Sequence, residues 1–164
     1  MNIRQREDRD LPACAAVLKE VHAKDGYPVE GVDDALGWLT PDGLVAAWVA
    51  ESDDRLLGHI CVTEERGEEA ARLWRARDSR PVGVLARLFV SPAARGCRLG
   101  EKLTRAAMED AERRGWRLVL DVMEKDRAAT RVYEKLGWES LGEIWHVVEG
   151  RRVPAFAYVS PARD

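Results

Sequence analysis

The chain has 164 residues, of which 46% are hydrophobic and 34% charged, and its formal net charge is −3. This length predicts one domain spanning residues 1–164, and this composition excludes disordered and fibrous proteins. Because the charge balance is slightly acidic, no overall field attracts a polyanion, and we expect neither a nucleic acid nor a membrane as partner.

The spacing of the cysteines and the hydropathy of the chain indicate the cellular compartment in which we expect the protein. The three cysteines, Cys14, Cys61 and Cys97, form no CxxC pair, so the sequence predicts neither a disulfide framework nor a zinc site. The longest uncharged run, residues 153–162, is about half the length of a membrane crossing. The charged start, MNIRQREDRD, differs from the apolar centre of a signal peptide. We therefore expect a cytoplasmic protein without a metal.

The first half of the chain mixes strand and helix patterns. Apolar residues recur at helical spacing after Asp10, which is the expected N-cap. Two apolar runs separated by residues 52–55 are typical of a β-hairpin. The charged segment 64–81 fits neither pattern and is interpreted as an irregular excursion. The expected elements are a strand over 2–6, a helix with Leu11, Cys14, Leu18 and Val21 on one face, a short helix over 33–39, and strands over 45–51 and 56–63.

The second half predicts alternating strands and helices. Leucine and alanine recur on one face of residues 99–114, and Gly115 ends this helix. A shorter helix follows Asp126 and ends at Gly137, where a left-handed backbone is favourable. This alternation implies crossover connections and at least one parallel pair in a mixed α/β sheet. The expected strands are 82–90, 118–123, 140–148 and 153–159, the last two antiparallel.

The clearest chemical signal lies in residues 88–100, LFVSPAARGCRLG. They run from a strand through a turn into a helix, which aims unpaired N–H groups and the positive end of a helix dipole at one point. A phosphate or pyrophosphate is the natural ligand, and Arg95 and Arg98 add positive charge. A tight turn that binds nothing is the alternative. The GxxxxGK[ST] and GxGxxG spacings are absent, which argues against ATP hydrolysis and a dinucleotide fold.

Two motifs carry a family resemblance. Leu88-Phe89-Val90-Ser91-Pro92 followed by Arg95-Gly96-x-x-x-Gly100 resembles the acyl-CoA signature of the GNAT superfamily of N-acetyltransferases. Downstream, Leu120-Asp121-Val122 and Val132-Tyr133-Glu134-Lys135-Leu136-Gly137-Trp138 are similar to the second half of that region. The resemblance is direct over residues 84–142. It implies a single-domain α/β fold with a mixed, mostly antiparallel sheet of about six or seven strands, flanked by helices and splayed at a parallel pair where the cofactor binds.

The resemblance also implies site residues. Loop amides would bind the pyrophosphate of acetyl-CoA, and an amide near Leu88–Val90 would stabilise the oxyanion formed in acyl transfer. Tyr133 matches the tyrosine that protonates the leaving thiolate, the alternative being a core aromatic side chain. The cofactor-binding candidates are Leu88, Phe89, Val90, Arg95, Gly96, Cys97, Arg98, Leu99, Gly100 and Asp126, and the acceptor-site candidates are Tyr27, Trp38 and Trp145.

Three positions depart from the family pattern. Arg98 replaces a glycine, and we expect an ordinary φ there. Asp126 stands where an asparagine is common, so its carboxylate can cap a helix but cannot donate. The strand before the loop carries Arg87 and no carboxylate, which leaves the familiar general-base position empty. The other base candidates are Glu51, His59, Glu64, Asp121 and His146, with a buried structural role equally expected for His59.

The resemblance therefore implies an enzyme, an N-acetyltransferase that moves the acetyl group of acetyl-CoA directly to an amine in a ternary complex. Two alternatives stay open: a non-catalytic acyl-CoA-binding sensor, and an acyltransferase that uses another acyl group or a hydroxyl acceptor. The acceptor is expected to be a small-molecule or peptide amine, and no motif identifies it. We expect no nucleophilic role for Cys97, because no histidine is placed to activate it. Family members often pair through C-terminal edge strands, so a homodimer is also expected.

Overall fold

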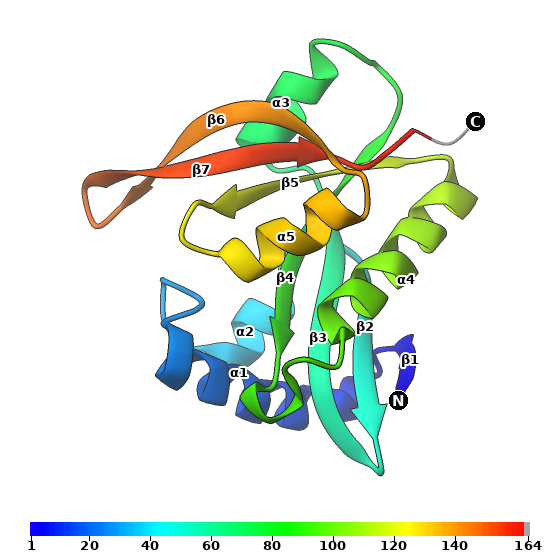
Figure 1. The fold of residues 1–164 in the computed structure, drawn as a ribbon, viewed down its shortest axis with the longest axis vertical. Helices are drawn as coiled ribbons and strands as arrows, with labels where there is room; N and C mark the ends of the chain where they lie inside the picture. The colour runs from blue at the N-terminus through cyan, green and yellow to red at the C-terminus, as the bar shows by residue number, and fades with distance from the viewer. Residues whose placement is uncertain (163–164) are drawn as a thin grey trace. The chain divides into compact units, whose positions relative to one another are not determined.

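The computed structural model describes residues 1–162. The described residues form two compact units, one of residues 1–63 and 86–107 and the other of residues 64–85 and 108–162. Strand β4 (Val82–Val90) and helix α4 (Leu99–Arg114) contribute residues to both units (Figure 1). The expectation of one domain over 1–164 stays a prediction.

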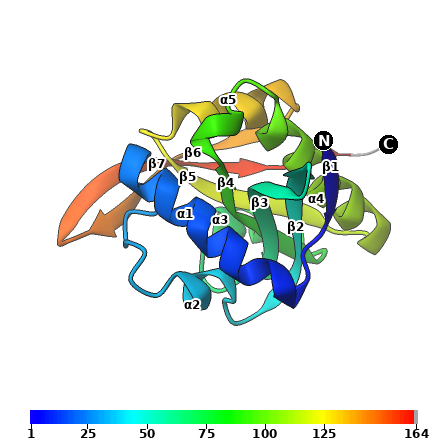
Figure 2. The same cartoon turned by 90° about the horizontal axis from the view of Figure 1, so that it is seen from below.

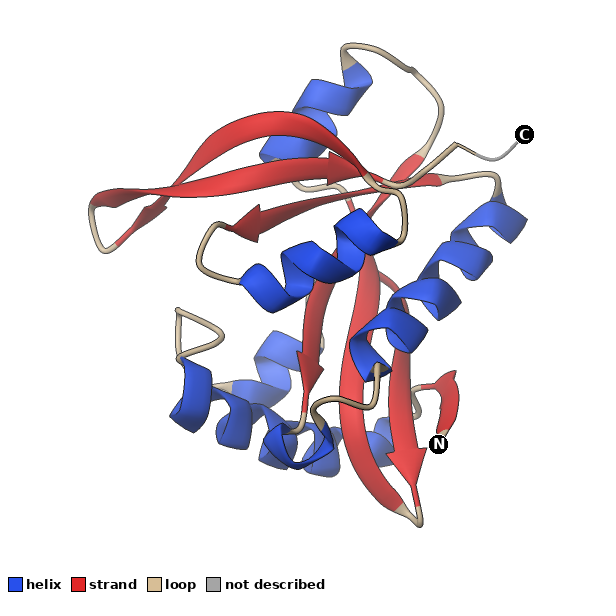
Figure 3. Ribbon diagram, in the orientation of Figure 1, coloured by secondary structure: helices blue, strands red, loops and turns tan. Residues whose placement is uncertain are grey.

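Seven strands form one mixed sheet in the order β1-β2-β3-β4-β5-β7-β6 (Figure 3). Strands β4 and β5 are parallel, with Val82–Val84 opposite residues 117–119. The pairs β1–β2, β2–β3, β5–β7 and β6–β7 are antiparallel. The mixed sheet and its parallel pair are thus confirmed, whereas the splay at the cofactor site stays a prediction. The other strands are β1 (Asn2–Gln5), β2 (Leu44–Ser52), β3 (Arg55–Glu64), β5 (Arg117–Met123), β6 (Glu139–Val148) and β7 (Arg151–Val159).

In the first unit, helices cover both faces of strands β2, β3 and the end of β4. Helices α1 (Leu11–Asp25) and α2 (Ala35–Leu39) lie on one face, and the first turns of α4 lie on the other (Figure 2). A Cβ atom at Gly58 on β3 would lie 3.0 Å from Cδ1 of Leu103, so glycine allows the close approach of α4. The core on the α1 side contains Cys14, Ala15, Val17, Leu18, Val21, Ala35, Leu39, Val49 and Phe89.

Asp10 precedes α1 as predicted, but its carboxylate makes no capping hydrogen bond to that helix. It accepts the N–H of Glu7 at 2.7 Å and two guanidinium N–H groups of Arg4 at 2.8 Å. The Arg4 guanidinium lowers the pKa of Asp10 to about 2. The predicted cap is therefore a salt bridge between β1 and the start of α1.

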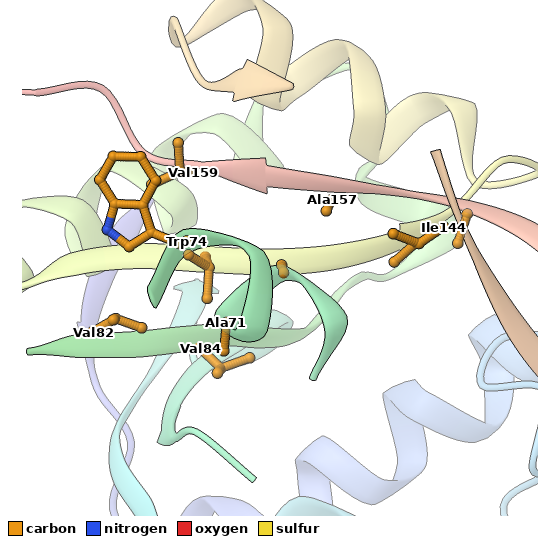
Figure 4. Packing of buried hydrophobic residues seen from close by; sticks show 10 residues of the cluster. Ala71, Trp74, Val82, Val84, Ile144, Ala157 and Val159 are labelled. Atoms are coloured by element: carbon orange, nitrogen blue, oxygen red, sulfur yellow. The ribbon is translucent and has the colours of Figure 1, made fainter. Parts of the chain in front are cut away.

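In the second unit, the charged segment 64–81 contains helix α3 (Glu69–Arg75), so the predicted irregular excursion was wrong. Ala70, Ala71 and Trp74 share one buried face of this helix, while its charged side chains face outward. Leu73 packs against the same core while half-buried, and a helix of seven residues in a charged run is too short to establish a helical period. Figure 4 shows Ala71 and Trp74 beside the strand residues of their cluster, which are Val82, Val84, Val119, Ile144, Ala155, Ala157 and Val159.

Helix α5 (Arg127–Lys135) lies on the opposite face of β5 and β7 from α3 (Figures 1 and 2). Its apolar side faces the sheet, and Gly137 adopts φ +84° just after it, as predicted for the end of this helix. Among the described residues, no helix is both long enough and apolar enough to span a bilayer.

His59, on β3, is a fully buried polar residue of the first unit. Its Nδ1–H donates to the backbone oxygen of Arg87 at 2.9 Å, and its Nε2 accepts from Nη1 of Arg6 at 2.9 Å. Burial lowers the pKa of His59 to about 4, and the neighbouring arginine charges act in the same direction. The imidazole is therefore neutral and fully hydrogen-bonded, which confirms the structural role expected for it.

Truncating Trp74 tests whether α3 belongs to the core. Because Trp74 is 8% exposed, we expect Trp74→Ala to lower the free energy of unfolding by about 3–5 kcal/mol in urea denaturation. Trp145→Ala is the matched control. Trp145 is 46% exposed, so its loss should cost less than about 1 kcal/mol. Equal costs for the two variants would contradict the placement of α3.

His59 should make stability depend on pH. Its pKa in the folded protein, about 4, lies below the ordinary 6.5, so the unfolded chain takes up the proton first. Stability is then complete above pH 6.5 and falls as the pH drops toward 4, by about 2 kcal/mol between pH 7 and pH 5. The lowered carboxyl pKa of Asp10 acts only below about 4. His59→Gln should remove this slope, and an unchanged slope in that variant would contradict the assignment.

Candidate functional site

The loop between β4 and α4 contains a short 3-10 turn, Pro92–Ala94, and two residues with left-handed backbone. Gly96 adopts φ +88° and Arg98 φ +59°. The expectation of an ordinary φ at Arg98 was therefore wrong. The carbonyl oxygen of Arg98 accepts the N–H of Lys102 at 3.1 Å, so this residue is held by the first turn of the helix. The conformation costs a side chain about 1 kcal/mol or more, which explains why glycine is usual there.

Five consecutive backbone N–H groups in this loop, those of residues 96–100, have no acceptor among the described residues. They stand at the N-terminus of a 16-residue helix, where the dipole adds partial positive charge. The loop is anchored at its C-terminal end, because Leu99 is buried and the Gly100 carbonyl accepts Oγ1 of Thr104 at 2.7 Å. This arrangement is suited to bind a phosphate or pyrophosphate.

The side chains of the loop differ in their surroundings. Arg95 forms an ion pair with Asp25 at the end of α1, so its charge is partly compensated. Arg98 and Cys97 are exposed. Burial raises the pKa of Cys14 to about 12 and of Cys61 to about 11, so those two thiols stay protonated. Among the described residues, no cluster of three or more His, Cys, Asp or Glu could hold a metal ion.

Strand β4 is irregular just before the loop. Arg87 adopts φ +56°, a left-handed conformation that interrupts the alternation of a strand and is typical of a bulge. Its carbonyl oxygen turns to His59. After the bulge Phe89 is buried and stacks on the His59 ring with centroids 5.0 Å apart, while Leu88 and Val90 are half-buried. The bulge thus fixes the backbone of the segment that the resemblance assigns to the oxyanion.

The structure brings two acceptor-site candidates together in the first unit. The rings of Tyr27 and Trp38 meet edge to face with centroids 5.8 Å apart, and Trp38 lies 6.0 Å from Phe89. The guanidinium carbon of Arg87 lies 4.8 Å from the centroid of the Trp38 ring. In the sequence, Arg87 was noted only as the charged residue of a strand that lacks the familiar carboxylate. No local pattern linked it to Trp38. The third candidate, Trp145, belongs to the second unit, where it stacks on Arg152.

Tyr133 occupies the second unit, on α5. Its ring is 6% exposed and packs against Trp138 and Tyr158, at centroid distances of 5.4 and 6.4 Å. Its hydroxyl has no hydrogen-bond partner among the described residues, yet it is not a fully buried atom, so the oxygen reaches solvent. Burial and then the Asp126 charge raise the pKa of Tyr133, so the phenol is protonated at neutral pH. Both readings of Tyr133, core aromatic and proton donor, fit this geometry.

The structure does not favour Glu51, His59 or Glu64, three of the candidates from the sequence, as a general base. Glu51 is held by Arg4, whose hydrogen bond lowers the pKa of that carboxyl. His59 is buried and already accepts and donates a hydrogen bond. Glu64 is exposed at the end of β3.

The remaining two candidates, Asp121 and His146, lie side by side in the second unit. Nε2 of His146 is 3.1 Å from Oδ2 of Asp121, which also accepts the N–H of Glu69, while Oδ1 accepts the N–H of Ala70. Asp121 therefore orients the His146 imidazole through its Nε2. Only the three-dimensional fold shows this pairing, because β7 separates the two strands in the sheet.

Two adjoining hollows at the start of α5 were not anticipated from the sequence. Their volumes are about 270 and 310 Å³, and they share Glu124 and Arg127. Phe156 contributes to one, and Val153 and Pro154 to the other. They lie wholly within the second unit.

Comparison with known proteins agrees with this fold and loop. The model of the acetyltransferase (GNAT) family matches residues 10–138. A mycothiol acetyltransferase of Nocardia farcinica is 33% identical over 138 residues, covering 77% of this chain and 42% of that relative. The chain thus spans less than half the length of this relative.

Two solved structures share the fold. A ribosomal-protein-alanine N-acetyltransferase from Brucella melitensis superposes with a TM-score of 0.75 at 22% identity, covering 98% of this chain and 99% of that one. The yncA protein of Salmonella typhimurium, solved with its cofactor acetyl-CoA, has a TM-score of 0.71 at 19% identity, with coverage of 96% and 91%. The matched family model, with the loop and fold described above, shows that the chain belongs to the acetyltransferase (GNAT) family.

Proposed function

We propose that the protein is an N-acetyltransferase that binds acetyl-CoA at residues 95–100 and transfers its acetyl group directly to an amine. The observation that carries the proposal is the row of five unpartnered N–H groups at residues 96–100, in a chain of the GNAT family. A pyrophosphate supplies acceptors for such a row, and the helix dipole favours its charge.

Residues 88–90 of the first unit and Tyr133 of the second unit would serve the remaining steps. The bulge at Arg87 fixes the amides of residues 88–90, one of which would donate to the carbonyl oxygen as it gains negative charge. Tyr133 would donate its proton, or a hydrogen bond, to the departing thiolate. Its raised pKa favours the hydrogen bond over complete transfer, since a free thiol has a pKa near 8.5.

Two alternatives are separated from this proposal by experiment. An acyl-CoA-binding sensor would bind coenzyme A without releasing free thiol in the presence of any amine. An acyltransferase of different specificity would release thiol from a longer acyl-CoA or with a hydroxyl acceptor.

Gly100→Glu tests the loop. A carboxylate beside the unpartnered N–H groups should repel the pyrophosphate, so we expect calorimetry to show loss of coenzyme A binding while the melting temperature without ligand changes little. Wild-type protein at a ligand concentration 100 times Kd should gain about 2.7 kcal/mol of stability. Ala76→Glu adds the same charge at an exposed position of the second unit and should bind normally. Unchanged affinity in Gly100→Glu would mean that the loop is only a structural turn.

Tyr133→Phe tests the proton donor. The substitution removes one oxygen from a packed ring, so the free energy of unfolding should change by less than about 1.5 kcal/mol. Turnover should fall by about 10²-fold at unchanged coenzyme affinity, as steady-state kinetics and calorimetry would show. Tyr158→Phe is the matched control, because that hydroxyl lies 3.4 Å from Glu134 and is assigned no catalytic role. Near-normal turnover of a folded Tyr133→Phe protein would leave Tyr133 as a core residue.

A further inference from the structure

The guanidinium groups of Arg6 and Arg87, both in the first unit, donate to consecutive carbonyl oxygens at the end of α2. We propose that they bind a carboxylate carried by the acceptor, so that the substrate is an amine with its own carboxylate, such as an amino acid. The inference rests on the proposed acetyltransferase function and narrows it to a substrate class.

The contacts of these arginines place them side by side. Nε of Arg87 donates to the Trp38 carbonyl oxygen at 2.7 Å, and Nη1 of Arg6 donates to the next carbonyl, that of Leu39, at 2.7 Å. Nη1 of Arg6 also reaches Nε2 of His59, whose other nitrogen donates to the Arg87 backbone. Consecutive carbonyl groups therefore hold both side chains, and one imidazole bonds the Arg6 side chain and the Arg87 backbone.

Each guanidinium keeps N–H groups that the protein does not use. The structure gives no partner to either Nη atom of Arg87 or to Nη2 of Arg6 among the described residues. None of these nitrogens is a fully buried atom without a partner, so all of them reach solvent. Two parallel N–H groups of a guanidinium match the two oxygens of a carboxylate.

The positive charge here lacks a negative partner. Arg4, two residues before Arg6 on the same segment, is paired with both Asp10 and Glu51. No ion pair joins Arg6 or Arg87 to a carboxylate within residues 1–162. His59 is neutral and adds no negative charge. Half-buried cations are normally paired, so an anionic ligand group would complete this cluster.

The surroundings favour a small amino acid over other amines. The Arg87 guanidinium stacks on Trp38, whose ring also packs against Tyr27 and Phe89, and aromatic rings suit the apolar part of a ligand. Two adjacent positive charges disfavour a polyamine. Arg87 directly precedes the segment 88–90 proposed to hold the thioester carbonyl. A carboxylate at Arg87 would thus leave a nearby amine on the same small molecule close to the reacting carbon.

The test compares matched acceptors. Amino acids, their carboxamides and the corresponding decarboxylated amines are supplied with acetyl-CoA, and kcat/KM is measured from thiol release. We expect the carboxylate form to be preferred at least tenfold. The amine of the carboxamide loses its proton more readily, so intrinsic reactivity would favour the carboxamide. A preference for the carboxylate form therefore cannot arise from intrinsic reactivity.

Variants assign the preference to the arginines. Arg87→Gln should lower kcat/KM for the amino acid at least tenfold more than kcat/KM for the carboxamide, and the difference should arise in KM. Arg6→Gln should act in the same direction, and provides the second test where Arg87→Gln fails to fold. Arg55→Gln, at the exposed start of β3, is the control with normal kinetics.

Three results would overturn the inference: equal use of carboxylate and carboxamide, no turnover of any carboxylate-bearing amine, or an unaltered preference in folded arginine variants. With coenzyme A binding intact, these results would leave the N-acetyltransferase proposal standing. Absence of coenzyme A binding would instead contradict that proposal itself.

Discussion

The two hydrogen bonds of the buried His59 imidazole hold the irregular part of β4 in place. One reaches the carbonyl oxygen of Arg87, which φ +56° has turned out of the regular strand, and the other reaches Arg6. A left-handed arginine inside a strand costs about 1–2 kcal/mol, and a donor with no alternative partner offsets that cost. The position of the Arg87 side chain and the course of the backbone after it both depend on this neutral histidine.

Two non-glycine residues with left-handed backbone, Arg87 and Arg98, lie at the two ends of one segment. Between them are the strand end assigned to the carbonyl and the loop assigned to the pyrophosphate. Such strain persists where the surrounding structure fixes the backbone, and it gathers at binding and catalytic sites. Here a histidine fixes the first position and the first turn of α4 fixes the second. Both of these features are consistent with a segment whose last residues, 96–98, present N–H groups rather than pair them.

Local patterns were enough to predict most of the elements. The long amphipathic α4, the β2–β3 hairpin and α5 with its terminal glycine have clear periodicity or turn chemistry, and all three appear where expected. Helix α3 escaped prediction because it has only seven residues, and so short an element within a charged run shows no clear period. The φ angle of Arg98 was predicted wrongly for a related reason. Propensity disfavours a left-handed arginine, and only the packing of the loop imposes this conformation.

Which side chains lie close together could be learned only from the three-dimensional fold. Arg6, His59 and Arg87 come from three strands or their ends, and Asp121 and His146 from two more, so no spacing rule connects them. Tyr133 was found from its motif, yet its buried ring and accessible hydroxyl are tertiary facts. The sequence thus predicted single candidate residues for catalysis and binding, whereas the order of the strands was needed to identify their partners.

Direct transfer is the central claim, and a single-turnover experiment with carbon-13-labelled acetyl-CoA tests it most directly. Enzyme in excess of labelled donor is mixed with an acceptor amine, quenched at intervals and analysed by mass spectrometry of both protein and products. Label should pass to the acceptor nitrogen with equimolar free coenzyme A, and no acetylated protein should form. Label that appears first on a protein side chain, such as the exposed Cys97, and then moves to the acceptor would contradict direct transfer. Label released only as acetate would contradict transfer to an amine.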